Sequence, residues 1–175
     1  MALVDISTIS IMIASGSVVA GITVAVMQLR NLVKTRKTGL VINLYGTFGS
    51  EEFRTKLLEL LALDFTNYDD YVKKYGSYFS NSPTSKTVAV IGVYFEGVGV
   101  LLHRRLIDAD LTSDLLGTPV EITWEKMKPI VDGLRVESGR PDGYVFYEYL
   151  YNEMKRIDAK RGIPSSQQMR SVPGG

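Results

Sequence analysis

The chain opens with a long apolar stretch, because no side chain between Ile6 and Leu29 carries a charge. In a helix this stretch would span about 36 Å, enough to cross the roughly 30 Å hydrocarbon layer of a membrane. Soluble helices of this length nearly always show a charged face, and this stretch shows none. The sequence therefore predicts a transmembrane helix over residues 6–29, preceded by a short N-terminal segment.

Two alternatives compete with a membrane anchor: a cleaved secretory signal and a helix buried in a soluble core. Signal peptides carry positive charge ahead of their apolar core. Here the only charged residue before Ile6 is Asp5. The uncharged run is also longer than a typical signal core. Both observations favour the anchor.

The charges that flank this stretch predict its orientation. No lysine or arginine precedes it, whereas Arg30, Lys34, Arg36 and Lys37 follow closely. The positive-inside rule then places the N-terminus outside the cell membrane and the remainder in the cytoplasm. The four cations would also contact anionic lipid headgroups, each contributing about 1 kcal/mol near the surface. We expect a single-pass membrane protein with membrane lipid among its partners.

Small residues recur along one face of the same stretch, at positions Ser10, Ala14, Ser17, Gly21 and Ala25. A face of this kind lets a second helix approach closely. It predicts association of the protein with itself or with another membrane protein. Glycine, alanine and serine are also common in membrane helices for other reasons, so both interpretations stay open.

The rest of the chain predicts an all-α fold. Residues 30–46 continue the helix as a basic juxtamembrane extension, in which Gly39 would permit a bend. Residues 47–162 show helical periodicity without sustained strand alternation, which predicts a compact cytoplasmic domain of about five to six helices. Residues 163–175 have the composition of a flexible tail.

Particular residues predict where the helices of this domain begin and end. Ser50 suits a helix N-cap, and Thr66 or Asn67 and Asp108 or Asp110 suit two others. Gly117 should end one helix and Pro119 open the next, with Pro129 kinking or breaking the latter near Met127. The apolar helix over residues 87–102 is too short for a second crossing and carries a central carboxylate, so it should be a buried core helix.

Composition excludes several classes of functional site. The chain has no cysteine, one histidine, and 20 basic against 19 acidic residues. Disulfides, thiolate metal sites and cysteine nucleophiles are therefore excluded, and most zinc and iron sites are disfavoured. The balanced charge disfavours a nucleic-acid partner. Because no phosphate-binding loop, serine-hydrolase motif or Glu-x-x-His pair occurs, we expect no enzyme activity, metal or cofactor.

Glu96 is the most informative single residue. Gly92, Gly99 and His103 share its helix face at positions i−4, i+3 and i+7. One interpretation is a ligand-binding groove in which Glu96 and His103 contact a ligand. The other is close helix packing, with Glu96 accepting hydrogen bonds from an arginine, tyrosine or tryptophan of a facing helix. Buried charges are usually paired and structural, which favours packing.

Aromatic side chains crowd the last predicted helix, where Tyr144, Phe146, Tyr147, Tyr149 and Tyr151 point in many directions. Some of these rings can fill the core, and the others must cover another surface. Tyrosine suits partly solvated contacts because its ring is apolar and its hydroxyl is polar. The cluster indicates either an interaction surface or rings that lie against their own domain.

Several segments together resemble a known family, namely "LYGTFGSEEFR", "YFEGVGVLLHRRLID", "TWEKMKPIVDGLR" and "YVFYEYLY". The family consists of membrane-anchored bacterial and archaeal proteins catalogued as domain of unknown function 4760, and the resemblance extends to about Lys160. It implies a single-pass anchor with a helical cytoplasmic domain and carries no activity. Phe95, Glu96, Gly97 and Trp124 match the family pattern, which implies that they matter first to the fold.

These observations lead to two hypotheses of function. The favoured one is a non-enzymatic protein, either an accessory or regulatory subunit of a membrane complex or a homo-oligomeric scaffold. The alternative is a membrane-tethered sensor or enzyme that uses the groove at Glu96 and His103.

Overall fold

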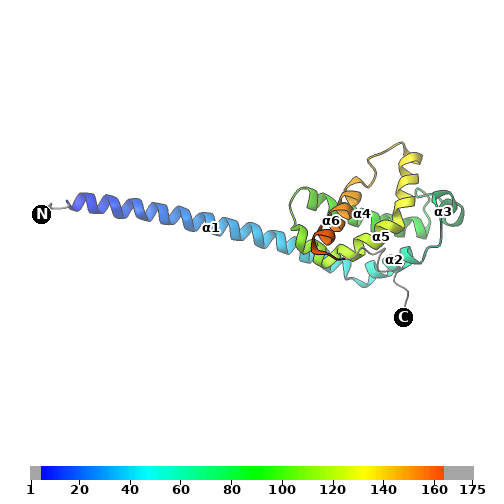
Figure 1. Ribbon diagram of the computed structural model, residues 1–175, viewed down its shortest axis with the longest axis horizontal. Helices are drawn as coiled ribbons and strands as arrows, with labels where there is room; N and C mark the ends of the chain where they lie inside the picture. Colours follow the sequence, from blue (N-terminus) through cyan, green and yellow to red (C-terminus); the bar gives the residue numbers. More distant parts are fainter. Residues whose placement is uncertain (1–4, 164–175) are drawn as a thin grey trace. The chain divides into compact units, whose positions relative to one another are not determined.

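The computed structural model describes residues 5–163, and over this range it contains six α-helices and no strand. The predicted all-α class is confirmed. The helices are α1 (Ile6–Phe48), α2 (Glu51–Ala62), α3 (Tyr68–Tyr75), α4 (Pro83–His103), α5 (Ala109–Ser138) and α6 (Val145–Arg161) (Figure 1). The predicted tail lies outside the described residues except for Ile163. The chain forms two compact units, Met1–Gly39 and Leu40–Gly175.

The first unit consists of the apolar part of α1. Every residue from Ala14 to Arg36 is exposed. Large apolar side chains such as Val19, Ile22 and Leu29 are each about 60% or more exposed. The helix is uninterrupted at Gly39, because the cost of one helical glycine, about 1 kcal/mol, is too small to end a long helix.

The second unit begins at Leu40, so the last turns of α1 belong to it. Val41 is fully buried in its core. The hydroxyl of Tyr94 donates a hydrogen bond to the carbonyl of Leu44 over 2.7 Å. These contacts join the end of α1 to α4.

Local capping residues set the start of four helices. The side chains of Ser50, Asn67, Ser82 and Asp108 each accept a hydrogen bond from a backbone N–H three residues later. Such a cap contributes about 1 kcal/mol. Ser50 is confirmed as a cap, and of the paired candidates the structure selects Asn67 and Asp108. Helix α6 differs, because it starts after Tyr144 without any side-chain cap of its own.

Helix α5 corrects a prediction. The expected helix end at Gly117, the new start at Pro119 and the break near Met127 are wrong, because α5 continues from Ala109 to Ser138 with Pro119 and Pro129 inside it. A kink near Met127 stays a prediction. A proline costs a helix about 3 kcal/mol. One face of α5 buries Leu116, Val120, Trp124, Met127, Ile130 and Val131. Each such side chain contributes about 1.5–3 kcal/mol when buried, so their sum outweighs the two prolines.

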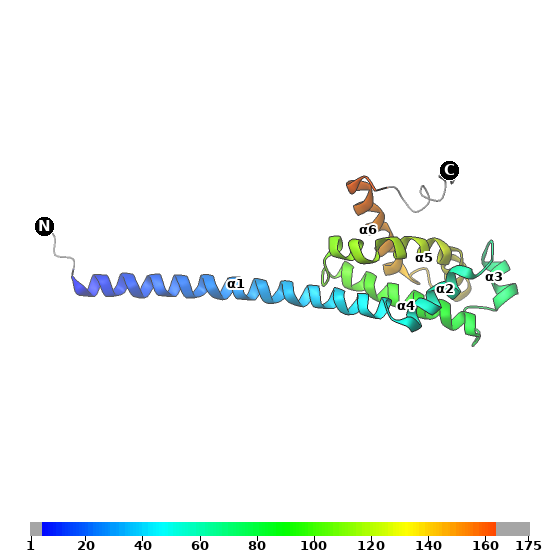
Figure 2. The same cartoon turned by 90° about the horizontal axis from the view of Figure 1, so that it is seen from below.

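Helix α4 lies at the centre of the second unit and packs against α2, α5 and α6. Figure 2 shows α6 crossing α4 and α5. The ring of Phe95 stacks on that of Tyr147 at 5.0 Å, and the Trp124 ring meets the same tyrosine at 4.8 Å. All three side chains are buried. The α4–α6 contact is therefore the centre of the core, as expected for a buried α4.

Candidate functional site

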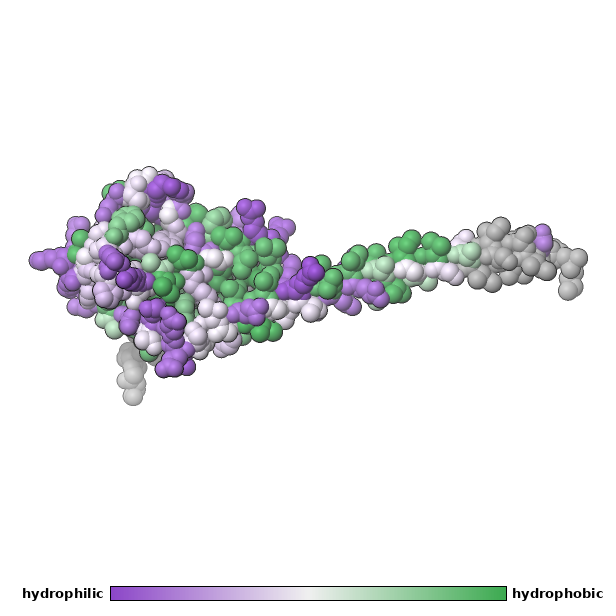
Figure 3. Space-filling model, turned by 180° about the vertical axis from the view of Figure 1, so that it is seen from behind, coloured by the Kyte–Doolittle hydropathy of each residue, from purple (hydrophilic) through white to green (hydrophobic). Residues whose placement is uncertain are grey.

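Two helices are long and apolar enough to cross a membrane by length and composition: the described part of α1 and α4. Half of the α4 stretch is buried in the core, which confirms it as a core helix. None of the α1 stretch is buried, and Figure 3 shows apolar surface along the described part of this helix. Helix α1 is thus a candidate membrane span, although an N-terminal signal sequence shares the same properties.

The small-residue face of α1 is open. Ala14, Ser17, Gly21 and Ala25 are all exposed, whereas the side chain of Ser10 lies outside the described residues. A Cβ added at Gly21 would meet no heavy atom within 4 Å. Among the described residues, Gly21 therefore makes no close contact that would require a glycine. Packing of a second helix on this face stays a prediction.

The basic residues after the apolar run are accessible. Arg30, Lys34 and Arg36 are exposed, and Lys37 is half-buried. None of the four forms an ion pair with another described residue. Their charges are therefore not neutralised by acidic side chains within the described chain. Contact with lipid headgroups stays a prediction.

Glu96 holds the start of α6. Its Oε1 accepts a hydrogen bond from the backbone N–H of Phe146 at 3.3 Å, and its Oε2 accepts one from Tyr147 at 2.7 Å. The first N–H groups of a helix have no partner within the helix. Because Tyr144 provides no side-chain cap, Glu96 of α4 caps α6 from a different helix. The expected partners were side chains, and the observed ones are backbone groups.

The connection between α5 and α6 is held by Arg135. Its Nε donates to the carbonyl of Gly143 at 2.8 Å, and its Nη2 donates to Glu148 at 2.7 Å. Burial raises the pKa of Glu96, while the two backbone N–H groups and the charge of Arg135 act in the opposite direction. Together, Glu96 and Arg135 fix the position of the first turn of α6.

The glycines beside Glu96 allow α6 to approach closely. A Cβ at Gly92 would lie 2.8 Å from the ring of Tyr144, and one at Gly99 would lie 2.0 Å from the carbonyl oxygen of Phe146. His103 is exposed, and its ring packs against Phe146. The glycine face is thus covered by α6, as the packing interpretation requires. Ligand binding by Glu96, His103, Gly92 and Gly99 stays a prediction.

The aromatic residues of α6 lie against their own domain. Tyr147 is fully buried, and its hydroxyl donates to Thr123 at 2.6 Å. Tyr144, Tyr149 and Tyr151 are partly buried and pack on the same core. This arrangement matches the second of the two interpretations of the cluster.

Replacing Glu96 by alanine should lower the free energy of unfolding by about 2 kcal/mol, because two N–H groups at the start of α6 lose their acceptor. Glu96→Gln retains one acceptor oxygen and should cost less than half as much. Urea unfolding followed by the fluorescence of Trp124, the single tryptophan, measures both. Equal losses for the two variants would contradict the capping role.

The pH dependence of these variants has a definite sign. The raised pKa of Glu96 means that the folded state favours the protonated carboxyl. Its contribution is complete below the ordinary pKa of 4.5 and is lost as the pH rises through the raised value. The stability of the native chain relative to Glu96→Gln should therefore fall as the pH rises above 4.5. Urea unfolding of both chains across this range measures it.

We call the contacts of Glu96 and Arg135 with the first turn of α6 the Glu96 junction. Its residues lie in a region of the chain that matches a family. Residues 15–154 match the family described as "Domain of unknown function (DUF4760)". The chain belongs to the DUF4760 family. No curated protein and no solved structure matches it.

In this DUF4760 protein, three of the four family-pattern residues meet at the start of α6. Glu96 binds the backbone of Tyr147, and Phe95 and Trp124 pack on its ring. Gly97 is exposed on the opposite side of α4, with no heavy atom within 4 Å of an added Cβ. The resemblance implied a role in the fold, and for Phe95, Glu96 and Trp124 the contacts agree.

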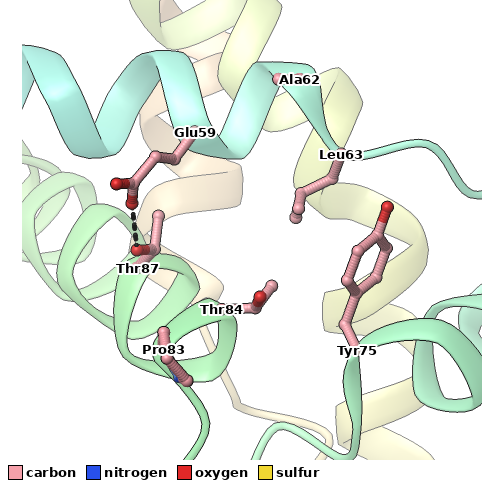
Figure 4. Close-up of a pocket in the computed structure, with 7 residues that line it drawn as sticks. All are labelled: Glu59, Ala62, Leu63, Tyr75, Pro83, Thr84 and Thr87. Carbon is pink, nitrogen blue, oxygen red and sulfur yellow. Dashed lines mark hydrogen bonds between the residues drawn. The ribbon is translucent and has the colours of Figure 1, made fainter.

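A cavity of about 370 Å³ was not predicted from the sequence. It lies between the end of α2, the end of α3 and the first turns of α4 (Figure 4). Its lining residues are Glu59, Ala62, Leu63, Tyr75, Pro83, Thr84 and Thr87. Pro83 and the acidic Glu59 were visible in the sequence, but no local pattern indicates that helices so far apart in the chain meet here.

Proposed function

We propose that this DUF4760 protein is a single-pass membrane protein that acts as a non-enzymatic subunit of a membrane assembly. It serves as an accessory or regulatory protein or as a homo-oligomeric scaffold. The observation that carries the proposal is the exposure of every residue from Ala14 to Arg36 on a helix that bears no charge before Arg30. A helix that is apolar on all sides requires lipid or a partner around it.

The orientation follows from the charges at the two ends of this helix. Asp5 precedes it, and Arg30, Lys34, Arg36 and Lys37 follow it. The positive-inside rule then supports an external N-terminus, a cytoplasmic helical domain and contact of the four cations with anionic lipid. The same distribution supports an anchor over a secretory signal, because signals carry their positive charge before the apolar run.

The orientation can be tested by single cysteine substitutions, since the chain has no cysteine. Ala2→Cys should react with a membrane-impermeant maleimide on intact cells. Val136→Cys should react only after the cells are opened, although Val136 is 84% exposed. The reverse pattern would contradict the proposed topology.

The assembly can be tested by gentle detergent extraction and native mass spectrometry. We expect a dimer, a larger oligomer or a complex with a second membrane protein. Gly21→Leu should reduce association, because the added side chain prevents close helix approach. Ile22→Leu, on the adjacent position, conserves volume and should leave it unchanged. A strict monomer with no associated protein would contradict the proposal.

The alternative of a sensor or enzyme at Glu96 and His103 has less support. Both carboxylate oxygens of Glu96 already accept hydrogen bonds from α6. A general acid or base requires a second group placed against the same substrate. Non-enzymatic function agrees better with these contacts.

A further inference from the structure

The cavity between α2, α3 and α4 has the size of a small-ligand site. Its volume of about 370 Å³ lies within the roughly 300–1,000 Å³ of typical small-molecule pockets. In Figure 4 the side chains of Leu63, Tyr75 and Thr84 point toward one space, with Glu59 and Thr87 along its side. Such pockets combine apolar walls with a few polar groups that fix the ligand.

The polar groups of this cavity are held in place by hydrogen bonds. The Oε2 of Glu59 accepts a hydrogen bond from the buried hydroxyl of Thr87 at 2.7 Å. The Tyr75 hydroxyl accepts one from the backbone N–H of Asp64 at 3.0 Å. Glu59 retains Oε1 as a further acceptor, and the Thr84 hydroxyl provides another. Two of these groups, the Glu59 carboxylate and the Tyr75 hydroxyl, are thus held by hydrogen bonds, and Glu59 is exposed to solvent at the mouth of the cavity.

The electrostatics favour a cation over an anion. Glu59 is the only charged residue of the lining, and it lies in the last turns of α2, near the negative end of the helix dipole. Two lysines lie nearby, but neither lines the cavity. Lys126 donates to the carbonyl of Leu63, and Lys74 forms an ion pair with Asp70 at 3.1 Å.

The apolar part of the lining limits the shape of that cation. Ala62, Leu63 and Pro83 provide apolar surface beside the carboxylate. A bare metal ion would find one carboxylate there and few other oxygen ligands. An ammonium group on a short hydrocarbon chain uses both parts, since it donates up to three hydrogen bonds and buries its carbon atoms.

We propose that this cavity binds a small organic ammonium compound, with the ammonium group on Glu59 and its hydrocarbon chain against Leu63 and Pro83. This site lies outside the Glu96 junction and uses residues that the proposed membrane role does not involve. Its test is independent of that role.

The test uses the full-length protein in detergent and two probes of similar size, butylammonium chloride and 1-butanol. Backbone amide NMR spectra are recorded during titration with each probe. Butylammonium should produce saturable shifts at Ala62, Leu63, Thr84 and Thr87, and 1-butanol should bind at least tenfold more weakly. This comparison requires no variant, so it does not depend on the folding of one.

A pair of variants on α2 provides the second measurement. Glu59→Gln removes the charge and keeps an acceptor for Thr87, so it should weaken butylammonium binding at least tenfold. Glu52→Gln changes an exposed carboxylate in the first turn of the same helix and should have no effect. Equal binding of the two probes, unchanged binding by Glu59→Gln, or the absence of saturable shifts would overturn the proposal.

Discussion

Replacing Gly99 by alanine should lower the free energy of unfolding by about 3 kcal/mol, close to the upper range for overpacking in a core. The added Cβ would lie 2.0 Å from the carbonyl oxygen and 2.5 Å from the carbonyl carbon of Phe146. Both are backbone atoms of α6, which cannot rotate away as a side chain would. Urea unfolding monitored by Trp124 fluorescence should show the loss directly.

The matched control lies two residues earlier on the same helix. A Cβ at Gly97 would meet nothing within 4 Å. Gly97→Ala should therefore raise stability by about 1 kcal/mol, the difference in helix propensity between the two residues. Opposite signs at these positions would confirm that α6 covers only one face of α4. A similar loss at both would mean that another surface packs on Gly97.

Two lysines in the middle of α1 should move the protein out of the membrane. A lysine at the centre of a spanning helix costs about 2.5–3.5 kcal/mol, so Val18→Lys combined with Ile22→Lys should cost about 6 kcal/mol. The native chain should sediment with membranes after an alkaline carbonate wash. The doubly substituted chain should remain in the supernatant, as followed by immunoblotting of both fractions.

Two controls accompany the lysine variant. Val18→Leu with Ile22→Leu keeps the helix apolar and should remain in the membrane fraction. A chain that begins at Leu40 lacks the apolar run but keeps the buried Val41, and it should be folded in the supernatant. Recovery of the intact native chain in water without detergent would contradict the anchor.

Features encoded by neighbouring residues could be predicted from the sequence. The uncharged run and the caps at Ser50 and Asp108 depend on side chains within a few positions of one another, and the structure agrees with both helix starts. Helix α5 could not be predicted in this way. The local signals of Pro119 and Pro129 indicate breaks, whereas its continuity depends on burial against other helices.

At the Glu96 junction too, local sequence predicted one feature, and another depends on contacts between distant residues. The glycines beside Glu96 indicated close packing on that face of α4, and α6 packs there. The hydrogen-bond partners could not be anticipated, since they are backbone groups of Phe146 and Tyr147. These groups need an acceptor because the first N–H groups of a helix have none within the helix, and Tyr144 provides no side-chain cap. The cavity beside Glu59 was missed because its walls come from three helices joined by loops.

The cap that α4 provides for α6 has a consequence for biosynthesis. A helix of 17 residues such as α6 is marginal by itself in water, and this one lacks a capping side chain of its own. Glu96 leaves the ribosome some fifty residues before the N–H groups that it binds. The face of α4 that α6 covers, which includes Phe95, therefore stays exposed on the nascent domain until nearly the whole chain has been synthesised. Protection of that face by a chaperone or by early membrane attachment would reduce aggregation during translation.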